Sequence, residues 1–275
     1  MKNKISFAIV TYHEEYKETV TFKTLVTSFY EMSNGDSLSI YVFDNTPRKV
    51  DMRMNTFCKY DEDIEIYYFT ENTNKGLPYA YNMMSKEAFS NAYEYIVLLD
   101  QDTSLPVDFY MKYTSCTHLL DINCPKVFSK SKLISPSIVK NYRSYNLLGF
   151  EKGSLNLQKI TCINSGLLIN LDFYTRIGGY NEELFLDFCD HDFIDKVKKS
   201  RDIVNVLDVS LEQDFSNDVH DLEQAKKRYN LYVRDLKVYY KGRNAIKLFF
   251  FVDLPHLLRL SMTHNSLYFL RKRFF

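Results

Sequence analysis

Four short apolar segments in the first hundred residues constrain the fold more than any other feature of the sequence. These segments, rich in β-favouring residues, are 5–11, 38–43, 64–69 and 95–99. Runs of this length are typical of buried strands. Segments long enough for crossover helices separate them, at 16–32, 52–60 and 77–92. The alternation predicts parallel βαβ units, and such sheets bind ligands beyond the carboxyl ends of their strands.

The regular alternation of predicted strands and helices ends after residue 106. We expect helices at 107–120, from about residue 189 and at 219–240, strands at 133–139, 160–170 and 203–209, and a mobile polar loop at 140–158. The last residues, from 247 onward, are aromatic and basic, and we expect helices there as well.

The overall charge is balanced, with 35 Lys and Arg against 35 Asp and Glu. A protein built around nucleic acid needs a basic surface for the phosphates, so we expect no nucleic-acid partner. The five cysteines include no C-x-x-C pair, which argues against a disulfide framework or a zinc ribbon and favours a reducing cytosol. The charge is nevertheless uneven, because from residue 237 onward eight Lys and Arg face a single acid, Asp253.

No segment of the sequence has the pattern of a signal peptide or a membrane-spanning helix. The apolar stretch near the start is cut short at His13. The late apolar run at 248–262 is interrupted by Asp253, Pro255, His256 and Arg259, and it falls short of the roughly 20 apolar residues that span a bilayer. We therefore expect a cytoplasmic protein.

Two carboxylates follow the fourth predicted strand directly. Asp100 and Asp102 flank Gln101, and alternate residues of an extended chain point to the same face. Two hard oxygen ligands placed in this way suit Mg²⁺ or Mn²⁺ carrying a phosphate. An acidic turn that caps the next helix is the alternative.

Further polar residues follow the second and third predicted strands. Asp44 could accept a hydrogen bond from a ribose hydroxyl or a base N–H, although Asp is also an ordinary turn residue. Asn74 and Gly76 precede a predicted helix, where backbone N–H groups could meet an anion. A simple glycine turn at a helix start explains these two residues equally well.

The densest acidic cluster lies in FLDFCDHDFIDK and comprises Asp187, Asp190, Asp192 and Asp195, with His191 among them. On a helix that begins near Cys189, Asp190 falls in the first turn, where negative charge is favoured. A carboxylate at a pocket-facing helix start could act as a general base. Solvated or helix-capping acids are the alternative.

Six motifs occur in an order that resembles the family 2 glycosyltransferases of the GT-A fold, and among bacterial members the rhamnosyltransferase-type enzymes that build O-antigen, capsule or other surface polysaccharide. The motifs are AIVTYH at 8–13, VFDN at 42–45, NKGLPYAYN at 74–82, LLDQDTS at 98–104, INSGLLI at 163–169 and GGYNEELFLDFCDHDF at 178–193.

The resemblance implies an α/β GT-A domain over residues 1–215, with a Rossmann-like, mostly parallel sheet flanked by helices, and a helical extension over 216–275. It implies inverting transfer of a sugar from a nucleotide-diphosphate donor, dTDP-rhamnose or a UDP-hexose, to a hydroxyl of a growing surface glycan. The cofactor would be Mn²⁺ or Mg²⁺. The acceptor would be a glycan in lipid-linked form, reached from the inner face of the membrane.

The motifs also imply roles for individual residues. Donor binding would fall to Thr11, Tyr12, Asp44, Asn74, Gly76, Asp100 and Gln101. The metal would be held by Asp102 together with Asp100, and Asp190 would be the general base. The acceptor side would include Asn164, Ser165, Gly166, Asp187, Arg228 and Arg234. The two arginines face the diphosphate or pair with acids on a solvated helix.

The sequence departs from the family pattern at two positions. Cys189 stands before Asp190, where the family usually has an acid, and Gln213 stands where many relatives carry a histidine that serves the metal or the diphosphate. His220 could replace that histidine as a metal ligand, or it could be structural.

The aromatic and basic tail leaves two interpretations open: a segment lying in a membrane interface, or helices packed on the catalytic domain or forming a homodimer contact.

Two other functions of the protein also remain open. One is a non-catalytic nucleotide-sugar or glycan-binding protein on the same fold. The other, a phosphatase of the D-x-D type, fits poorly because its motif usually lies on the first strand rather than the fourth.

Overall fold

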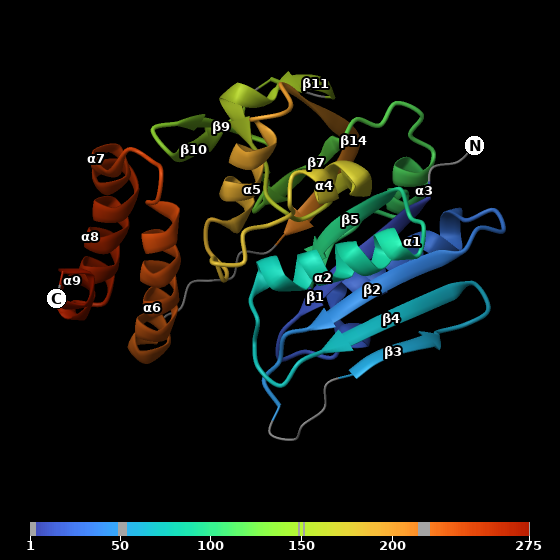
Figure 1. The fold of residues 1–275 in the computed structure, drawn as a ribbon, viewed down its shortest axis with the longest axis horizontal. Helices are drawn as coiled ribbons and strands as arrows, with labels where there is room; N and C mark the ends of the chain where they lie inside the picture. Colours follow the sequence, from blue (N-terminus) through green and yellow to red (C-terminus); the bar gives the residue numbers. More distant parts are fainter. Residues whose placement is uncertain (1–3, 49–53, 148, 151, 214–220, 275) are drawn as a thin grey trace.

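The computed structural model describes residues 4–48, 54–147, 149–150, 152–213 and 221–274 (Figure 1). The strands are β1 (Ile5–Thr11), β2 (Leu38–Asp44), β3 (Met54–Lys59), β4 (Ile64–Thr70), β5 (Tyr95–Asp100), β6 (Thr103–Ser104), β7 (Ile122–Ser129), β8 (Lys132–Ser135), β9 (Ser137–Lys140), β10 (Arg143–Asn146), β11 (Gly153–Asn156), β12 (Ile160–Thr161), β13 (Leu167–Asn170) and β14 (Ile203–Gln213). The α-helices are α1 (Val20–Met32), α2 (Leu77–Ser90), α3 (Phe109–Thr114), α4 (Leu171–Arg176), α5 (Cys189–Val197), α6 (Leu222–Tyr239), α7 (Ala245–Leu248), α8 (Leu254–Thr263) and α9 (Tyr268–Phe274). Short 3₁₀ turns at Tyr16–Glu18 and Leu157–Lys159 and a π-helical turn at Phe249–Asp253 complete the regular structure.

One mixed sheet forms the centre of the molecule. Its path runs β11-β14-β7-β13-β5-β1-β2-β4-β3, and β9, β10 and β12 form a second, three-stranded sheet. The adjacent strands β5, β1, β2 and β4 are all parallel, as the apolar runs predict. The α/β class and the positions of these four strands are therefore confirmed.

The parallel register brings the ends of these strands to one edge of the sheet. Thr11 lies opposite Asp44, and Asp44 lies opposite Thr70 on the next strand. On the other side of β1, Asp100 lies opposite Val10. The polar residues that follow each apolar run therefore meet at the carboxyl edge.

Helices cover both faces of the sheet. On one face α1 and α3 bury Phe22, Phe29 and Phe109 against it. On the other, α2, α4 and α5 bury a second apolar cluster that includes Tyr81 and Phe193. The α1 helix begins where the Thr19 side chain accepts a hydrogen bond from the Phe22 N–H, a standard N-cap.

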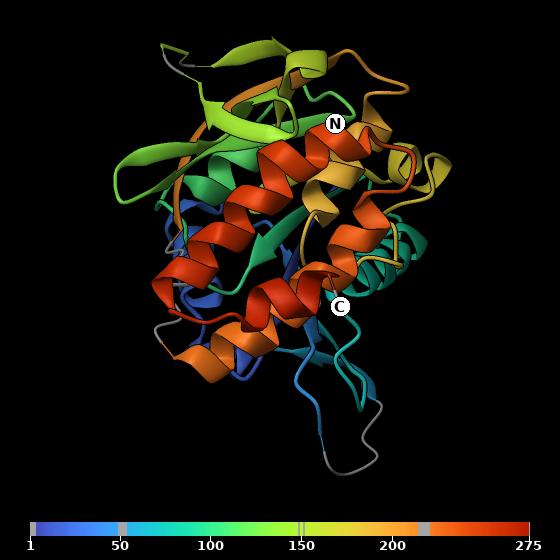
Figure 2. The ribbon, with the colours of Figure 1, turned by 90° about the vertical axis from the view of Figure 1, so that its left-hand side faces the viewer.

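The helices α6–α9 form a third apolar cluster beside the sheet (Figure 2). Tyr229, Leu257 and Phe269 are buried at its centre. Arg273 of α9 pairs with the buried carboxylate of Asp253 at 2.6 Å, which ties the end of the chain to the π-helical turn. Within the described residues, no helix is both long enough and apolar enough to cross a bilayer.

The predicted crossover helix at 52–60 is wrong. The chain there forms the edge strand β3, antiparallel to β4. Thr56, Phe57 and Cys58 are β-favouring, and pairing with β4 satisfies the backbone groups that a helix would have satisfied internally. The return from β2 to the parallel β4 is thus made through an extended segment.

The structure also corrects four predictions after residue 106. The strand expected at 160–170 is divided into β12 of the small sheet and β13 of the large one. The strand expected at 133–139 is divided at Pro136 into β8, which pairs with β7 of the large sheet, and β9 of the small one. The loop expected at 140–158 contains β10 and β11, which pair with β9 and β14. The helix expected at 107–120 is only the six residues of α3.

The buried imidazole of His256 should make stability depend on pH. Burial lowers the pKa of His256 to about 4, and its ring packs against Tyr232 with centroids 4.1 Å apart. Because the unfolded chain binds this proton more readily than the folded one, the free energy of unfolding should fall by about 2 kcal/mol between pH 7.5 and pH 5. Urea unfolding at both pH values measures this loss. The variant His256→Gln should lack that part of the pH dependence, and equal pH dependence in the two proteins would contradict the assignment.

Candidate functional site

Asp100, the last residue of β5, is held by three hydrogen-bond donors. Its Oδ1 accepts from the Tyr81 hydroxyl at 2.8 Å, and its Oδ2 accepts from the Ser165 hydroxyl at 2.5 Å and from the Gln213 amide at 3.1 Å. Burial and the neighbouring charge of Asp100 raise the pKa of Tyr81, so the phenol keeps its proton and remains a donor. The carboxylate is therefore fixed in orientation.

Gln213 links the two carboxylates of the D-x-D motif. Its Nε2 also donates to Asp102 Oδ1 at 3.3 Å, so oxygen atoms of Asp100 and Asp102 converge on one point. The pairing of β14 with β6 places Gln213 opposite Thr103, beside the motif. The amide oxygen Oε1 of Gln213 is buried and has no hydrogen-bond partner among the residues that the structure describes. His220, the predicted alternative ligand, lies outside the described residues.

Asp44 ends β2 on the wall of a cavity of about 560 Å³. Its Oδ1 accepts from the Thr46 N–H at 2.9 Å, and its Oδ2 accepts from Tyr68 at 2.7 Å and Arg48 at 2.5 Å. Burial opposes ionisation, but these hydrogen bonds outweigh it and hold the pKa of Asp44 below its usual value. Asp44 is therefore a carboxylate at neutral pH.

The end of β1 supplies two more of the predicted residues. The Thr11 hydroxyl is buried, and no described residue hydrogen-bonds to it. The Tyr12 N–H donates to Gln101 Oε1 at 2.6 Å, which ties the loop after β1 to the D-x-D motif. Thr11, Tyr12 and Gln101 are thus brought to the same edge as Asp100.

The turn that contains Asn74 and Gly76 is positioned by Asn45, which we did not include among the candidate site residues. Asn45 Oδ1 accepts from the Lys75 N–H at 2.9 Å, and its amide donates to the Gly76 carbonyl at 3.1 Å. Gly76 has a φ of 85°, and a Cβ there would lie 2.5 Å from the carbonyl oxygen of Phe185. Only glycine fits this position. The VFDN motif contained the signal, because Asn45 directly follows Asp44.

A second unanticipated residue, Asp235 of α6, positions the loop before α5. Its fully buried carboxylate accepts hydrogen bonds from the N–H groups of Phe185, Leu186 and Asp187 at 2.8–3.0 Å. Burial raises the pKa of Asp235, while the three N–H groups act in the opposite direction. This loop leads directly into the first turn of α5, which carries Asp190.

The predicted residues Asp187, Arg228 and Arg234 all contact this loop or its partner α6. The Arg228 guanidinium binds the Asp187 carboxylate through both terminal nitrogens, with Nη2 at 2.6 Å from Oδ1. Arg234 lies over the Phe185 ring, 5.0 Å from its centroid. In this structure both arginines therefore fix the loop before α5.

The side chain of Tyr180 is affected by the charges of both Asp190 and Asp100. Asn164 Oδ1 accepts from the Tyr180 hydroxyl at 2.6 Å, and the Asn164 amide contacts the Cys189 sulfur at 3.6 Å. Burial is the main cause that raises the pKa of Tyr180, and the charges of both Asp190 and Asp100 raise it further. Both carboxylates thus act electrostatically on the same buried phenol.

Two predicted acceptor residues lie beneath the site. Ser165 donates its hydroxyl to Asp100, as described above. Gly166 has a φ of 79°, and its carbonyl accepts from the Tyr113 hydroxyl at 2.7 Å. A Cβ at Gly166 would lie 2.5 Å from Pro125 and 2.7 Å from Leu211. Gly166 therefore allows β13 to begin close against the core below Asp100.

Comparisons with known proteins identify the fold. No family model and no curated protein matches the sequence. Among solved structures, residues 1–349 of TarS from S. aureus match with a TM-score of 0.54 and 13% identity, over 98% of this chain and 80% of that one. GalNAc-T7 with UDP, GalNAc and Mn²⁺ matches with a TM-score of 0.59 and 12% identity, over 96% of this chain and 55% of that one. The chain also covers 48% of a longer TarS structure, so it spans about half of these two longer chains.

TarS 1–349 has also been solved with UDP-GlcNAc, and that structure matches with a TM-score of 0.57 and 13% identity, over 98% of this chain and 79% of that one. Both named proteins are glycosyltransferases. At this level of identity the likeness establishes the fold, and it confirms the GT-A architecture expected from the sequence.

Removing the Asp235 carboxylate should destabilise the protein substantially. Asp235→Ala leaves three half-buried N–H groups without their acceptor, and we expect the free energy of unfolding to fall by about 3 kcal/mol. The matched control is Asp208→Ala, because Asp208 is exposed and pairs with exposed Lys152. The control should change stability by less than about 0.5 kcal/mol. Urea unfolding of both variants measures the difference, and similar values would refute the role given to Asp235.

Proposed function

We propose that the chain is an inverting glycosyltransferase of the rhamnosyltransferase type, which moves a sugar from a nucleotide-diphosphate donor to a hydroxyl of a growing surface glycan. The observation that carries the proposal is the convergence of Asp100 and Asp102 at the carboxyl edge of a parallel sheet, with Asp190 nearby on the start of α5. Structures of the same fold hold UDP, UDP-GlcNAc, or UDP with Mn²⁺.

The donor nucleotide would lie along the edge formed by the ends of β1, β2 and β5. The unpartnered Thr11 hydroxyl and the ionised Asp44 offer groups for a base and a ribose. Uracil and thymine present the same hydrogen-bonding edge, which is why UDP- and dTDP-linked sugars are both candidate donors. The donor sugar itself, rhamnose or a hexose, is left to experiment.

The residues at the D-x-D motif fit a divalent cation. Two carboxylate oxygens converge on the Gln213 amide, and a half-turn of that amide would present its unpartnered oxygen to the same point. Asp100, Asp102 and Gln213 would then hold Mg²⁺ or Mn²⁺ through oxygen, with water and phosphate completing the shell. When bound, such an ion stabilises the negative charge of the departing diphosphate.

Asp190 would take the proton of the acceptor hydroxyl. It lies in the first turn of α5, half-buried, and its Oδ1 accepts from the His191 N–H at 2.7 Å. A carboxylate within hydrogen-bond reach of the attacking oxygen acts as general base. Because that oxygen attacks opposite the diphosphate, a single displacement inverts the anomeric centre.

Turnover of a panel of UDP-, dTDP- and GDP-sugars tests the proposal. We expect purified protein with Mn²⁺ to release nucleotide from one donor and to lose this activity with a chelator. Asp102→Ala should abolish metal-dependent donor binding. Asp190→Asn should leave donor binding intact and slow transfer about 10³-fold, because it removes the general base. Nucleotide release and calorimetric donor binding measure the two effects separately.

Two outcomes would contradict these assignments. Transfer by Asp190→Asn at a near-normal rate would remove Asp190 as the base. Donor binding without turnover, even in the presence of glycan acceptors, would favour the non-catalytic binding protein. The control Asp172→Asn changes an exposed acid that pairs with Arg176, and it should leave both binding and turnover unchanged.

We also propose that α7–α9 seat the protein on the inner face of a membrane, where a lipid-linked acceptor would be found. Ile246 on α7, Phe250 in the π-helical turn, and Leu258 and Met262 on α8 are 45–77% exposed, and we call these four side chains the apolar stripe. Exposed cations accompany the stripe, and residues 241–274 contain no acid except buried Asp253. An apolar stripe with positive charge matches an anionic bilayer surface.

Removing the stripe should abolish membrane binding. We expect the variant Phe250→Ser/Leu258→Ser/Met262→Ser to bind phosphatidylserine-containing liposomes at least about 100-fold more weakly, because three apolar side chains no longer enter the lipid. Co-sedimentation measures the binding. The control variant Phe57→Ser/Val107→Ser/Ile203→Ser changes exposed apolar residues elsewhere and should bind normally. Unchanged liposome binding together with a dimer that dissociates would instead make the stripe a homodimer contact.

A further inference from the structure

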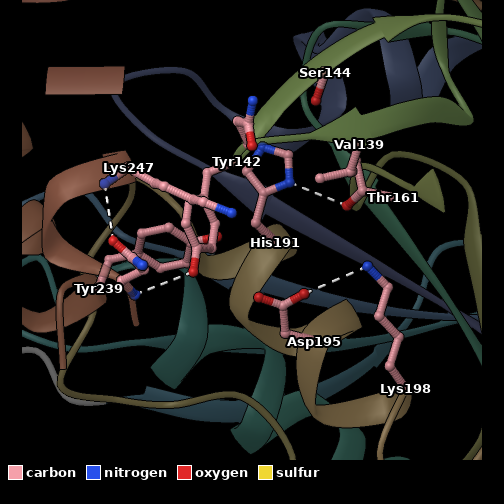
Figure 3. Close-up of a pocket in the computed structure, with 11 residues that line it drawn as sticks. Val139, Tyr142, Ser144, Thr161, His191, Asp195, Lys198, Tyr239 and Lys247 are labelled. Carbon is pink, nitrogen blue, oxygen red and sulfur yellow. Dashed lines mark hydrogen bonds and ion pairs between the residues drawn. The ribbon is translucent and has the colours of Figure 1, made fainter. Parts of the chain in front are cut away.

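A second cavity, of about 260 Å³, lies apart from the D-x-D motif. It is bounded by the β9–β10 hairpin, the exposed side of α5, and the segment from the end of α6 to α7 (Figure 3). Its lining includes Tyr142, Thr161, His191, Asp195, Tyr239 and Lys247. None of these residues has a part in the donor chemistry proposed above.

The cavity adjoins the candidate general base. His191 directly follows Asp190, and Asp195 lies one turn further along the same helix. Burial is the main cause that raises the pKa of Tyr239, and the charges of Asp195 and Asp190 both raise it further. A group bound in this cavity would therefore lie near an acceptor hydroxyl at Asp190.

The lining suits a hydroxylated molecule. Tyr142 and Tyr239 provide rings and hydroxyls, and the Thr161 hydroxyl lies 3.0 Å from His191 Nδ1. In Figure 3 the His191 ring lies between Tyr142 and Thr161. Aromatic faces beside hydroxyl and amide groups provide the mixed apolar and hydrogen-bonding surface that small-molecule sites require.

The charges of the cavity leave one cation in excess. Asp195 is compensated by Lys198 at 3.4 Å and by Arg243 at 3.1 Å, and Arg243 also pairs with Asp192 at 2.9 Å. Lys247 is exposed, and no ion pair to it is found among the described residues. Its ammonium group is therefore available to a ligand.

We propose that this cavity binds an anionic group of the acceptor, a phosphate or a carboxylate, on a unit of the glycan next to the one that carries the attacked hydroxyl. The proposal rests on the transferase function, because that function supplies the acceptor. Lys247 contacts the anion, while the tyrosine rings and the Thr161–His191 pair contact the sugar or polyol that bears it. The site selects charged acceptors over neutral ones.

Binding of simple probes tests the cavity without any need for turnover. Protein with ¹⁵N-labelled histidine is titrated with glycerol phosphate, with glucuronate and with neutral glucose, at constant pH and ionic strength. His191→Gln identifies the His191 signal. We expect saturable shifts of that signal with at least one anion and none with glucose. The probe that binds, glycerol phosphate or glucuronate, shows whether the anionic group is a phosphate or a carboxylate.

Lys247→Met should weaken anion binding about tenfold, because it removes a charged donor and keeps the length of the side chain. Lys241→Met is the matched control, since Lys241 pairs with Glu183 outside the cavity lining, and it should bind the anion normally.

No shift with either anion, or equal binding by Lys247→Met and the wild type, would overturn the proposal. Nucleotide release from donor alone should be unchanged in Lys241→Met. Anion binding without any donor turnover would contradict the transferase, whereas turnover without anion binding would contradict only this site.

Discussion

The parallel register of β5, β1, β2 and β4 is the constraint on which the site depends. The register places Thr11 opposite Asp44 and brings Asp100 to the same edge. Each of these residues comes from a different part of the sequence, and only the backbone ladder assembles them. Because parallel strands cannot slip by one residue without moving every side chain to the opposite face, the buried cores on both sides of the sheet also fix the positions of the polar residues.

Around this edge, buried polar groups are satisfied mainly by long-range partners. Asp100 accepts from residues on α2, before β13 and at the end of β14, and Asp235 accepts from a loop some 50 residues earlier in the chain. An unpaired buried carboxylate is costly, so each network holds its members in one arrangement. Within the described ranges, the Gln213 amide oxygen and the hydroxyls of Thr11 and Thr103 are exceptions at this edge, because they are buried without a partner.

The sequence predicted the elements whose residues carry a clear local pattern, namely the buried parallel strands and the start of α5. The continuous apolar runs located the four parallel strands, and the start of α5 near Cys189 followed from its acidic first turn. The edge strand β3 was missed because its residues are mixed in character and its stability comes from pairing with β4. The division at Pro136 was missed because an apolar run by itself does not show that its two halves pair with different sheets.

The same distinction holds for the site. Asp100, Asp102, Asp44 and Asp190 belong to recognisable motifs, whereas Asp235 and Asn45 act on backbone groups that the sequence alone does not bring near them. Tyr81 was visible within a motif, but its contact with Asp100 depends on how α2 crosses the sheet. The contacts of Asp187, Arg228 and Arg234 likewise depend on how α6 packs against the loop before α5, which the sequence does not show.

Helix α6 contacts both the loop before α5 and the helices at the C-terminal end. At one point along its length Asp235 holds the loop that leads into α5, and elsewhere Tyr229 packs into the cluster formed with α8 and α9. Helix α6 therefore connects the helices that carry the apolar stripe to the turn that carries Asp190. If the protein lies on a bilayer as proposed, the tilt of those helices would set the height and direction of the proposed general base above the membrane. The acceptor would then be met by lateral diffusion in two dimensions instead of by capture from the bulk solution.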